Sequence, residues 1–343
     1  MMMPAKQNRQ GSGFMNIHRR SLLAAGAAGA LLPLAGREAL AQARWQLATP
    51  YPDGNFHTRN LRQFVEAAQQ ASGGALQIQM HTNAALLKMP EIRRGIQTGQ
   101  VQMGEILISA YGNEDPFFEV DGIPQLVTSY EQARRLADLS RPYIEARLKR
   151  TGITLLYMVP WPPSGFYTNF PVDSIEALRG NKMRTFSAAT NRFATLVGAT
   201  PTLVQAAEVP QAFATGVVNS MVTSAATGVD VQAWDFAKFF TPIGFTWTKN
   251  AVMVQTRALE ALPEAARKAV LDGAKEAETR GWEMSAAEQV AREKILAERG
   301  MTVNQPSAAL REGMAKVSET MVQEWLAKAG EDGKKLIDAY RAA

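Results

Sequence analysis

Arg184 is the residue whose type and position point most directly to chemistry. The run Lys182 to Phe186 is predicted as a short strand, and the polar stretch Ser187 to Asn191 after it can begin a helix that runs to about Val197. In open α/β sheets, ligands lie beyond the carboxyl ends of the strands. A guanidinium at such an end can hold a carboxylate through two parallel hydrogen bonds. The segment therefore predicts an anion-binding arginine, with an ordinary structural arginine as the alternative.

Groups that could carry catalysis or hold a metal are scarce. The chain has no cysteine, and beyond the N-terminal segment its only histidines are His57 and His81, which lack His-x-x-x-His spacing. A Gly-x-Ser-x-Gly elbow and a phosphate-binding glycine-rich loop are both missing from the sequence. We therefore expect no enzyme, no metal and no cofactor. A secreted enzyme is the rival from another functional class.

The N-terminal segment has the composition of an export signal. Arg19-Arg20 precede an apolar run from Ser21 to Ala35, and Ala41-Gln42-Ala43 follows as a small-residue cleavage site. We expect residues 1–43 to be a cleaved signal peptide that directs the chain to the periplasm, by the Sec or the twin-arginine route. The alternative is a retained membrane anchor, against which the apolar run argues because it is too short to span a bilayer.

Length, composition and charge limit what the rest of the chain can be. The chain has 343 residues, 46% of them hydrophobic and 20% charged, which fits two globular domains. Without residues 1–43, 32 basic and 31 acidic side chains remain, a net charge of about +1. No basic footprint for nucleic acid is left.

Hydrophobic periodicity predicts strands alternating with helices, hence an α/β fold with parallel pairing. In the first half, strands are expected at residues 45–49, 75–81 and 101–108, and helices at 57–71 and 90–98. A second half is expected to begin near Trp161 and to hold strands at residues 182–186 and 202–205, with a helix from Glu208 to Gly216. Further strands are predicted at residues 153–159 and 250–255.

Long helical patterns occupy the C-terminal part. Residues 263–298 contain few helix breakers and would span about 50 Å as one helix. The alternative is two helices broken at Gly281. Residues 307–342 are predicted as further amphipathic helix.

From residue 44 onward the chain resembles the solute-binding proteins of TRAP transporters, the DctP family. The resemblance is carried by the strand and arginine at Lys182-Met183-Arg184, the helix after them, and Gly198-Ala199-Thr200-Pro201. It implies a two-lobed periplasmic-binding-protein architecture with a long helix bridging both lobes. Lobe I would comprise residues 44–160 and 250–289, and lobe II residues 161–249 and 290–343. It also implies that Arg184 binds the ligand carboxylate and that membrane permease subunits are the partners.

Two departures from the family pattern bear on the ligand. Ser164 or Gly165 stands where a second arginine is often found, and Thr223 stands in place of an asparagine. A buried carboxylate without a partner is costly, so one arginine suggests one carboxylate. Thr223 and Ser187 could donate hydroxyl hydrogen bonds to it.

Aromatic side chains near the same loop suggest an apolar wall for the ligand body. Trp161 and Phe166 are the main candidates and Trp234 a weaker one, with packing in the core as the alternative. From the first half, we expect contacts from the residues that follow strands, namely Ser109, Tyr111, Asn55 and Phe56.

Together these features predict capture of a small organic acid. We expect a monocarboxylate with an apolar or aromatic body, such as an aryl 2-oxo or 2-hydroxy acid. The alternatives are a C4-dicarboxylate or sugar-acid binder in the same role, and a module that presents its ligand to a sensor.

Overall fold

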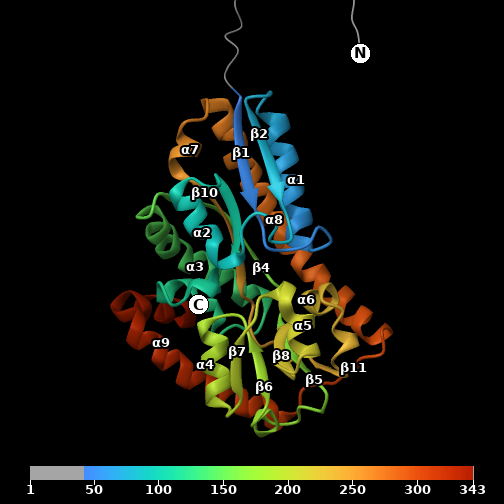
Figure 1. The fold of residues 1–343 in the computed structure, drawn as a ribbon. Coiled ribbons are helices and arrows are strands. Elements are labelled where there is room, and N and C mark those ends of the chain that lie inside the picture. Colours follow the sequence, from blue (N-terminus) through green and yellow to red (C-terminus); the bar gives the residue numbers. More distant parts are fainter. Residues whose placement is uncertain (1–41, 343) are drawn as a thin grey trace, which may run out of the picture. The chain divides into compact units, whose positions relative to one another are not determined.

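The structure is a computed structural model that describes residues 42–342. The predicted signal segment lies outside these residues apart from its last two. The described chain contains two β-sheets with helices packed on them, which is the two-lobed α/β architecture implied by the resemblance (Figure 1). We call the five-stranded sheet with its helices the first lobe, and the six-stranded sheet with its helices the second lobe. The exact residue division given above stays a prediction.

The first sheet is built around the expected β-α-β-α-β run and has the order β2-β1-β3-β10-β4. β1 pairs in parallel with both β2 and β3, as the pattern predicts. β10 returns from the second half of the chain and runs antiparallel to β3 and β4. The elements are β1 (Ala43–Ala48), α1 (Phe56–Ala71), β2 (Leu76–His81), α2 (Met89–Thr98), β3 (Met103–Leu107), β4 (Ile153–Pro160) and β10 (Lys249–Gln255).

The second sheet has the order β11-β9-β5-β8-β6-β7, with β6 parallel to its neighbours β7 and β8. β5 runs antiparallel to β8 and β9. The elements are β5 (Ser164–Thr168), β6 (Lys182–Thr185), α4 (Ala188–Leu196), β7 (Thr200–Leu203), α5 (Val209–Ala214), β8 (Ser220–Ser224), α6 (Ala225–Asp230), β9 (Phe239–Thr241) and β11 (Thr302–Val303).

The position of β7 corrects the sequence-based prediction. A strand was expected over residues 202–205, but β7 pairs from Thr200 to Leu203 with Lys182 to Thr185. Pro201 therefore lies inside the strand instead of before it. β7 is an edge strand that pairs with β6 alone, so the backbone N–H that Pro201 lacks is not needed for pairing with a second neighbouring strand.

Long helices connect and flank the lobes. α8 (Glu264–Glu298) is one unbroken helix, so the alternative of a break at Gly281 is wrong. It contacts α1 and β4 of the first lobe and α6 and β11 of the second, and thus bridges both (Figure 1). The predicted C-terminal helix is α9 (Ala308–Ala342), interrupted by a non-helical Gly330.

Two other helices complete the architecture, α3 (Tyr130–Lys149) and the short α7 (Thr256–Glu260). The sequence pattern did not predict α3, which carries Pro142 in its interior, a residue that normally kinks or ends a helix. Within residues 42–342, no helix has both the length and the apolarity needed to cross a membrane.

Candidate functional site

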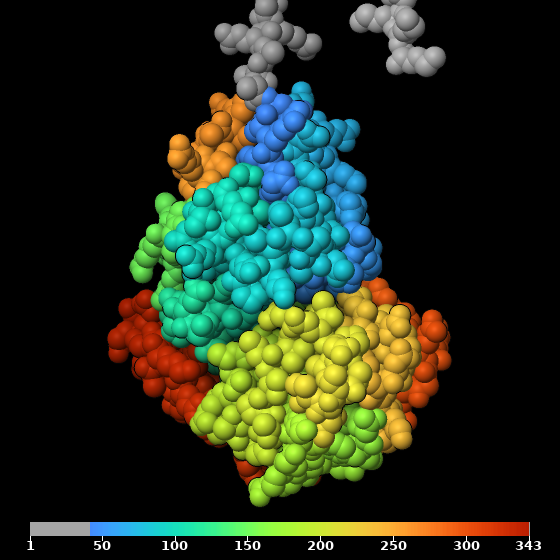
Figure 2. Space-filling view, viewed as in Figure 1, coloured from blue at the N-terminus to red at the C-terminus, as the bar shows by residue number. Residues whose placement is uncertain are grey.

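A small cavity lies where the two lobes meet, with a volume of about 50 Å³. That is room for only a few water-sized molecules, so the lobes leave little space between them. On the face seen in Figure 2, the first lobe, blue to cyan, rests directly on the second, green to yellow. First-lobe segments contribute Tyr51, Met89, Leu107 and Ala110, second-lobe segments contribute Ser164, Arg184, Phe186, Gln205, Ala206, Thr223, Ser224 and Thr227, and the crossover segments contribute Trp161 and Thr248.

Arg184 is the one charged residue among those that line this cavity. It lies on β6, only 4% of its surface is exposed, and burial lowers the pKa of its guanidinium to about 10. Its Nε donates a hydrogen bond to the Val204 carbonyl at 2.9 Å, which fixes the plane of the guanidinium. None of the ion pairs formed among residues 42–342 includes Arg184. A buried cation without a counterion favours an incoming anion.

Neutral polar groups surround this cation. Ser164 on β5 lies opposite Ser224 on β8, and Gly165 lies opposite Thr223 in the same antiparallel pair. Ser164 and Thr223 both line the cavity, although their successive positions in this pair direct the two side chains to opposite faces of the sheet. Hydroxyl groups can donate to or accept from a ligand without adding charge.

Trp161 also lines the cavity, where it lies beside Tyr51. The two rings meet edge to face, with centroids 5.1 Å apart. Phe186 adds a third aromatic ring, with the Arg184 guanidinium 5.3 Å from its centroid. The aromatic wall predicted from the sequence thus contains Trp161, although its other members differ from those expected.

Three of the expected aromatic and loop residues lie away from the cavity. The Phe166 ring is fully buried in the second lobe, where it packs against Phe193 and Phe245. Gly165 packs so closely on β9 that an added Cβ would lie 2.4 Å from the Thr241 carbonyl oxygen. Trp234 stacks with Arg299 in a separate apolar cluster.

Several expected polar contacts are instead used within the fold. Ser187 caps α4 by accepting from the Thr190 N–H. Asn55 caps α1 and also donates to Asp230. The Tyr111 hydroxyl donates to the backbone carbonyl of Met89. None of these three residues lines the cavity.

The remaining two candidates, Phe56 and Ser109, do not line the cavity. Phe56 is buried against the Trp161 ring, with centroids 5.5 Å apart, and supports it from behind. Ser109 is fully buried in the short 3-10 helix after β3, and its Oγ finds no hydrogen-bond partner among residues 42–342.

The cavity residues missed by the sequence analysis share one feature. Most lie at the carboxyl end of a strand or within three residues after it, as Tyr51 does after β1, Phe186 after β6 and Ser224 at the end of β8. Proximity to a strand's carboxyl end was therefore a usable signal. Among residues 42–342, there is no group of His, Asp or Glu side chains that could hold a metal ion.

A two-lobed α/β chain with an unpaired arginine in a cavity between the lobes has the build of a solute-binding protein. Residues 47–329 match the family described as "Bacterial extracellular solute-binding protein, family 7", DctP, and the chain belongs to this family. The resemblance inferred from the sequence is confirmed. The family is one of solute-binding transport components, not of enzymes.

Solved structures of other solute-binding proteins are highly similar to this chain. DctP6 of Bordetella pertussis, an extracytoplasmic solute receptor binding pyroglutamic acid, is 41% identical, with a TM-score of 0.86 over 88% of this chain and 100% of that one. DctP7 of the same organism, also described as binding pyroglutamic acid, is 44% identical, with a TM-score of 0.86 over 87% of this chain and 99% of that one. A TRAP solute-binding protein from a marine metagenome, in complex with pyroglutamate, is 32% identical, with a TM-score of 0.86 over 88% and 99%.

Curated relatives match over a shorter region. A solute-binding protein of Albidiferax ferrireducens is 25% identical over 63% of this chain and 65% of its own length. The C4-dicarboxylate-binding periplasmic protein DctP of Rhodobacter capsulatus is 26% identical over 60% of this chain and 62% of its own length. The chain thus spans slightly less than two thirds of either curated relative.

Proposed function

We propose that this protein is the periplasmic solute-binding subunit of a TRAP transporter, which captures a small monocarboxylate and delivers it to membrane permease subunits. The observation that carries the proposal is Arg184, a buried cation in a cavity between two lobes, with no counterion among residues 42–342. A ligand carboxylate would supply the missing charge and accept two parallel hydrogen bonds from the guanidinium. Family membership supports the transport role and the periplasmic location.

The lining of the cavity favours one carboxylate over two. Arg184 is its single cationic side chain, and the other polar groups are hydroxyls, an amide and an indole. A second carboxylate would be buried there without a counterion, which is costly. The C4-dicarboxylate and sugar-acid alternatives are therefore less well supported, although one curated relative carries a dicarboxylate name.

Pyroglutamate is the first candidate ligand. It is a compact monocarboxylate, and three relatives with 32–44% identity are described as binding it. Its lactam group can exchange hydrogen bonds with Ser164 and Thr223, while Trp161 would flank the ring. The cavity of about 50 Å³ would have to widen for any of these acids, and more for the aryl 2-oxo and 2-hydroxy acids expected from the sequence than for the smaller pyroglutamate.

A thermal-shift screen with calorimetry tests the ligand class. Pyroglutamate, phenyllactate and succinate would be compared on the mature protein. At about 100 times its dissociation constant, a true ligand should add roughly 2.7 kcal/mol of stability. We expect pyroglutamate to stabilise most and succinate least. Stabilisation by succinate alone would contradict the monocarboxylate assignment.

Arg184 variants test the anchor. Arg184→Ala should cost about 2–5 kcal/mol of binding free energy, a loss of thirtyfold or more, because a charge-assisted pair in a closed cavity is removed. Arg184→Lys keeps the charge but loses the fork and the bond to Val204, so it should restore only part of the affinity. Arg192→Ala is the matched control, since Arg192 is an exposed arginine that pairs with Glu324. Unchanged affinity in Arg184→Ala would refute the assignment.

A further inference from the structure

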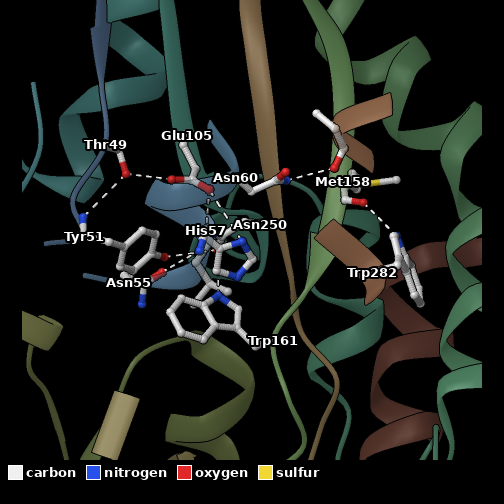
Figure 3. A network of polar contacts seen from close by, with 12 residues as sticks. Thr49, Tyr51, Asn55, His57, Asn60, Glu105, Met158, Trp161, Asn250 and Trp282 are labelled. Atoms are coloured by element: carbon white, nitrogen blue, oxygen red, sulfur yellow. Dashed lines mark hydrogen bonds and ion pairs between the residues drawn. The ribbon is translucent and has the colours of Figure 1, made fainter. Parts of the chain in front are cut away.

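A buried polar network lies behind the wall formed by Tyr51 and Trp161. It comprises Thr49, Tyr51, Glu105, Trp161 and Asn250, all with less than a tenth of their surface exposed (Figure 3). Only Tyr51 and Trp161 reach the cavity. The other three come from β1, β3 and β10, the central strands of the first sheet, or from the residue directly after one of them.

Asn250 is the centre of this network. Its Oδ1 accepts hydrogen bonds from Trp161 Nε1 at 2.8 Å and from the Tyr51 hydroxyl at 3.1 Å. Its Nδ2 donates to Glu105 Oε1 at 3.1 Å. An indole N–H can only donate, so the Asn250 oxygen must face Trp161. One amide orientation therefore satisfies all three contacts, and the reverse orientation would set a donor against the Trp161 donor.

Glu105 holds that orientation from the far side. Its Oε2 accepts from Thr49 Oγ1 at 2.6 Å, while Oε1 faces the Asn250 amide. A neutral Glu105 could donate its proton to Thr49 and still accept from Asn250 through Oε1. The orientation of Asn250 is therefore kept in both protonation states of the carboxyl group.

Trp161 is held by packing as well as by this bond. The His57 ring lies 4.4 Å from its ring between centroids, and Phe56 and Tyr51 meet it edge to face. Its backbone N–H donates to Thr248 at 2.8 Å. The packing limits where the indole plane can move, and the Asn250 oxygen fixes the direction of its N–H.

We propose that Glu105 and Asn250 are positioning residues, which fix Tyr51 and Trp161 in the cavity wall before the ligand arrives and thereby set which acids fit beside Arg184. The inference rests on the proposed function of the same cavity. A wall that is already ordered loses less conformational entropy on binding, so compact acids that match it bind more tightly. Neither residue touches the cavity, which explains why the sequence analysis singled out neither.

The indole N–H resonance of Trp161 in the ligand-free protein is the direct test. Trp161→Phe assigns this signal among those of the six tryptophans. Asn250→Leu and Glu105→Leu should move the resonance upfield and speed its exchange with solvent. Glu105→Gln is the matched control, because an amide can reproduce the contacts of the neutral carboxyl, and should leave the resonance in place. Pyroglutamate affinity should fall tenfold or more in both leucine variants and less than threefold in the glutamine variant.

Tyr51→Phe gives a second reading should a leucine variant fail to fold. It removes one of the two donors to Asn250 Oδ1 and adds no buried group, so the Trp161 indole signal should move downfield as its own bond strengthens. No movement in Tyr51→Phe, or an unmoved indole signal in a folded Glu105→Leu, would overturn the positioning role. If indole signals respond as expected but no acid binds the wild type, the proposed function fails and the network's hold on the wall stands. If acids bind the wild type but the indole signal responds in none of the variants, the proposed function stands and the positioning role of Glu105 and Asn250 fails.

Discussion

Arg184 and Glu105 are two buried ionisable residues near Tyr51, and burial acts on them in opposite ways. Desolvation disfavours the charged form of both, so it lowers the pKa of Arg184 to about 10 and raises the pKa of Glu105 to about 7. The arginine stays charged at any pH a cell meets. The carboxyl group, in contrast, changes its charge close to neutrality.

The raised pKa of Glu105 gives a prediction for stability against pH. Its folded pKa of about 7 exceeds its ordinary value of 4.5, so the folded state retains a proton that the unfolded state releases between these values. Stability should therefore fall as pH rises through this window. Between pH 5 and pH 8 the loss should be about 2–3 kcal/mol. Urea unfolding of wild type and Glu105→Gln at both pH values measures it, because the glutamine cannot titrate.

His57 contributes with the opposite sign and must be separated from Glu105. It lies 3.6 Å from the carboxylate, and burial lowers its pKa well below 6.5. Its folded state stays neutral while the unfolded chain takes up a proton, so stability should fall as pH drops below about 6.5. His57 is present in both proteins, so only the difference between them reports Glu105. Parallel pH profiles would show that the carboxyl group titrates normally.

The sequence predicted part of the cavity and misled for the rest. Arg184 was named from its place at a strand end, Ser164 and Thr223 from departures from the family pattern, and Trp161 as an aromatic residue of the same loop. All four line the cavity, while their contact with a ligand stays a prediction. Ser187 was named for its hydroxyl group and Asn55 for its place after a strand, but both cap helices. The hydroxyl and amide groups that suit a ligand are also those that suit a helix N-terminus, and sequence does not tell the two uses apart.

At the scale of elements, two glycines in α8 have different roles. A Cβ on Gly281 would lie 2.3 Å from Val159 Cγ2 and 2.7 Å from Asn60 Nδ2, so this glycine lets the helix approach β4 and α1 closely. A Cβ on Gly273 would meet only the Phe64 ring, at 3.5 Å. The sequence left a break at Gly281 open as the alternative to one long helix, because a glycine needed for close packing cannot be told by residue type from one that ends a helix.

The two glycines form a matched pair for mutation. Gly281→Ala should destabilise the protein by about 1–3 kcal/mol through overpacking. Gly273→Ala should stabilise it by up to about 1 kcal/mol, since alanine favours the helix. Denaturant unfolding of both variants decides the matter. Equal effects in the two variants would mean that α8 does not depend on a close approach at Gly281.

The existence of most strands was predictable, but the direction of β10 was not. Its apolar run predicted a strand over residues 250–255, and the structure places β10 at Lys249–Gln255 between β3 and β4. Its antiparallel pairing depends on how the chain crosses back from the second lobe. Hydrophobic periodicity is identical for either direction, so only the three-dimensional path sets it.

At the scale of the whole described molecule, contacts outside the cavity join the lobes. Asn55, at the start of α1, donates to Asp230, at the end of α6, at 2.6 Å. Lys88, before α2, lies 3.8 Å from Glu208, before α5. Both pairs link the first lobe to the second without lining the cavity. They can exist only while the lobes are close together, so they favour the closed arrangement over an open one.

Asp230→Ala should therefore weaken ligand binding although it removes no cavity residue. If binding requires closed lobes, apparent affinity falls with the closed population, and loss of this part-buried charge-assisted bond should lower pyroglutamate affinity about five- to tenfold. Lys88→Ala should change it less than about threefold, because that pair is exposed. Asp53→Ala is the control, since its carboxylate pairs with Arg62 within the first lobe. Small-angle scattering should show a larger radius of gyration for ligand-free Asp230→Ala than for wild type, and equal radii at saturation. A variant with wild-type affinity and wild-type scattering would mean that the Asn55–Asp230 bond follows closure without favouring it.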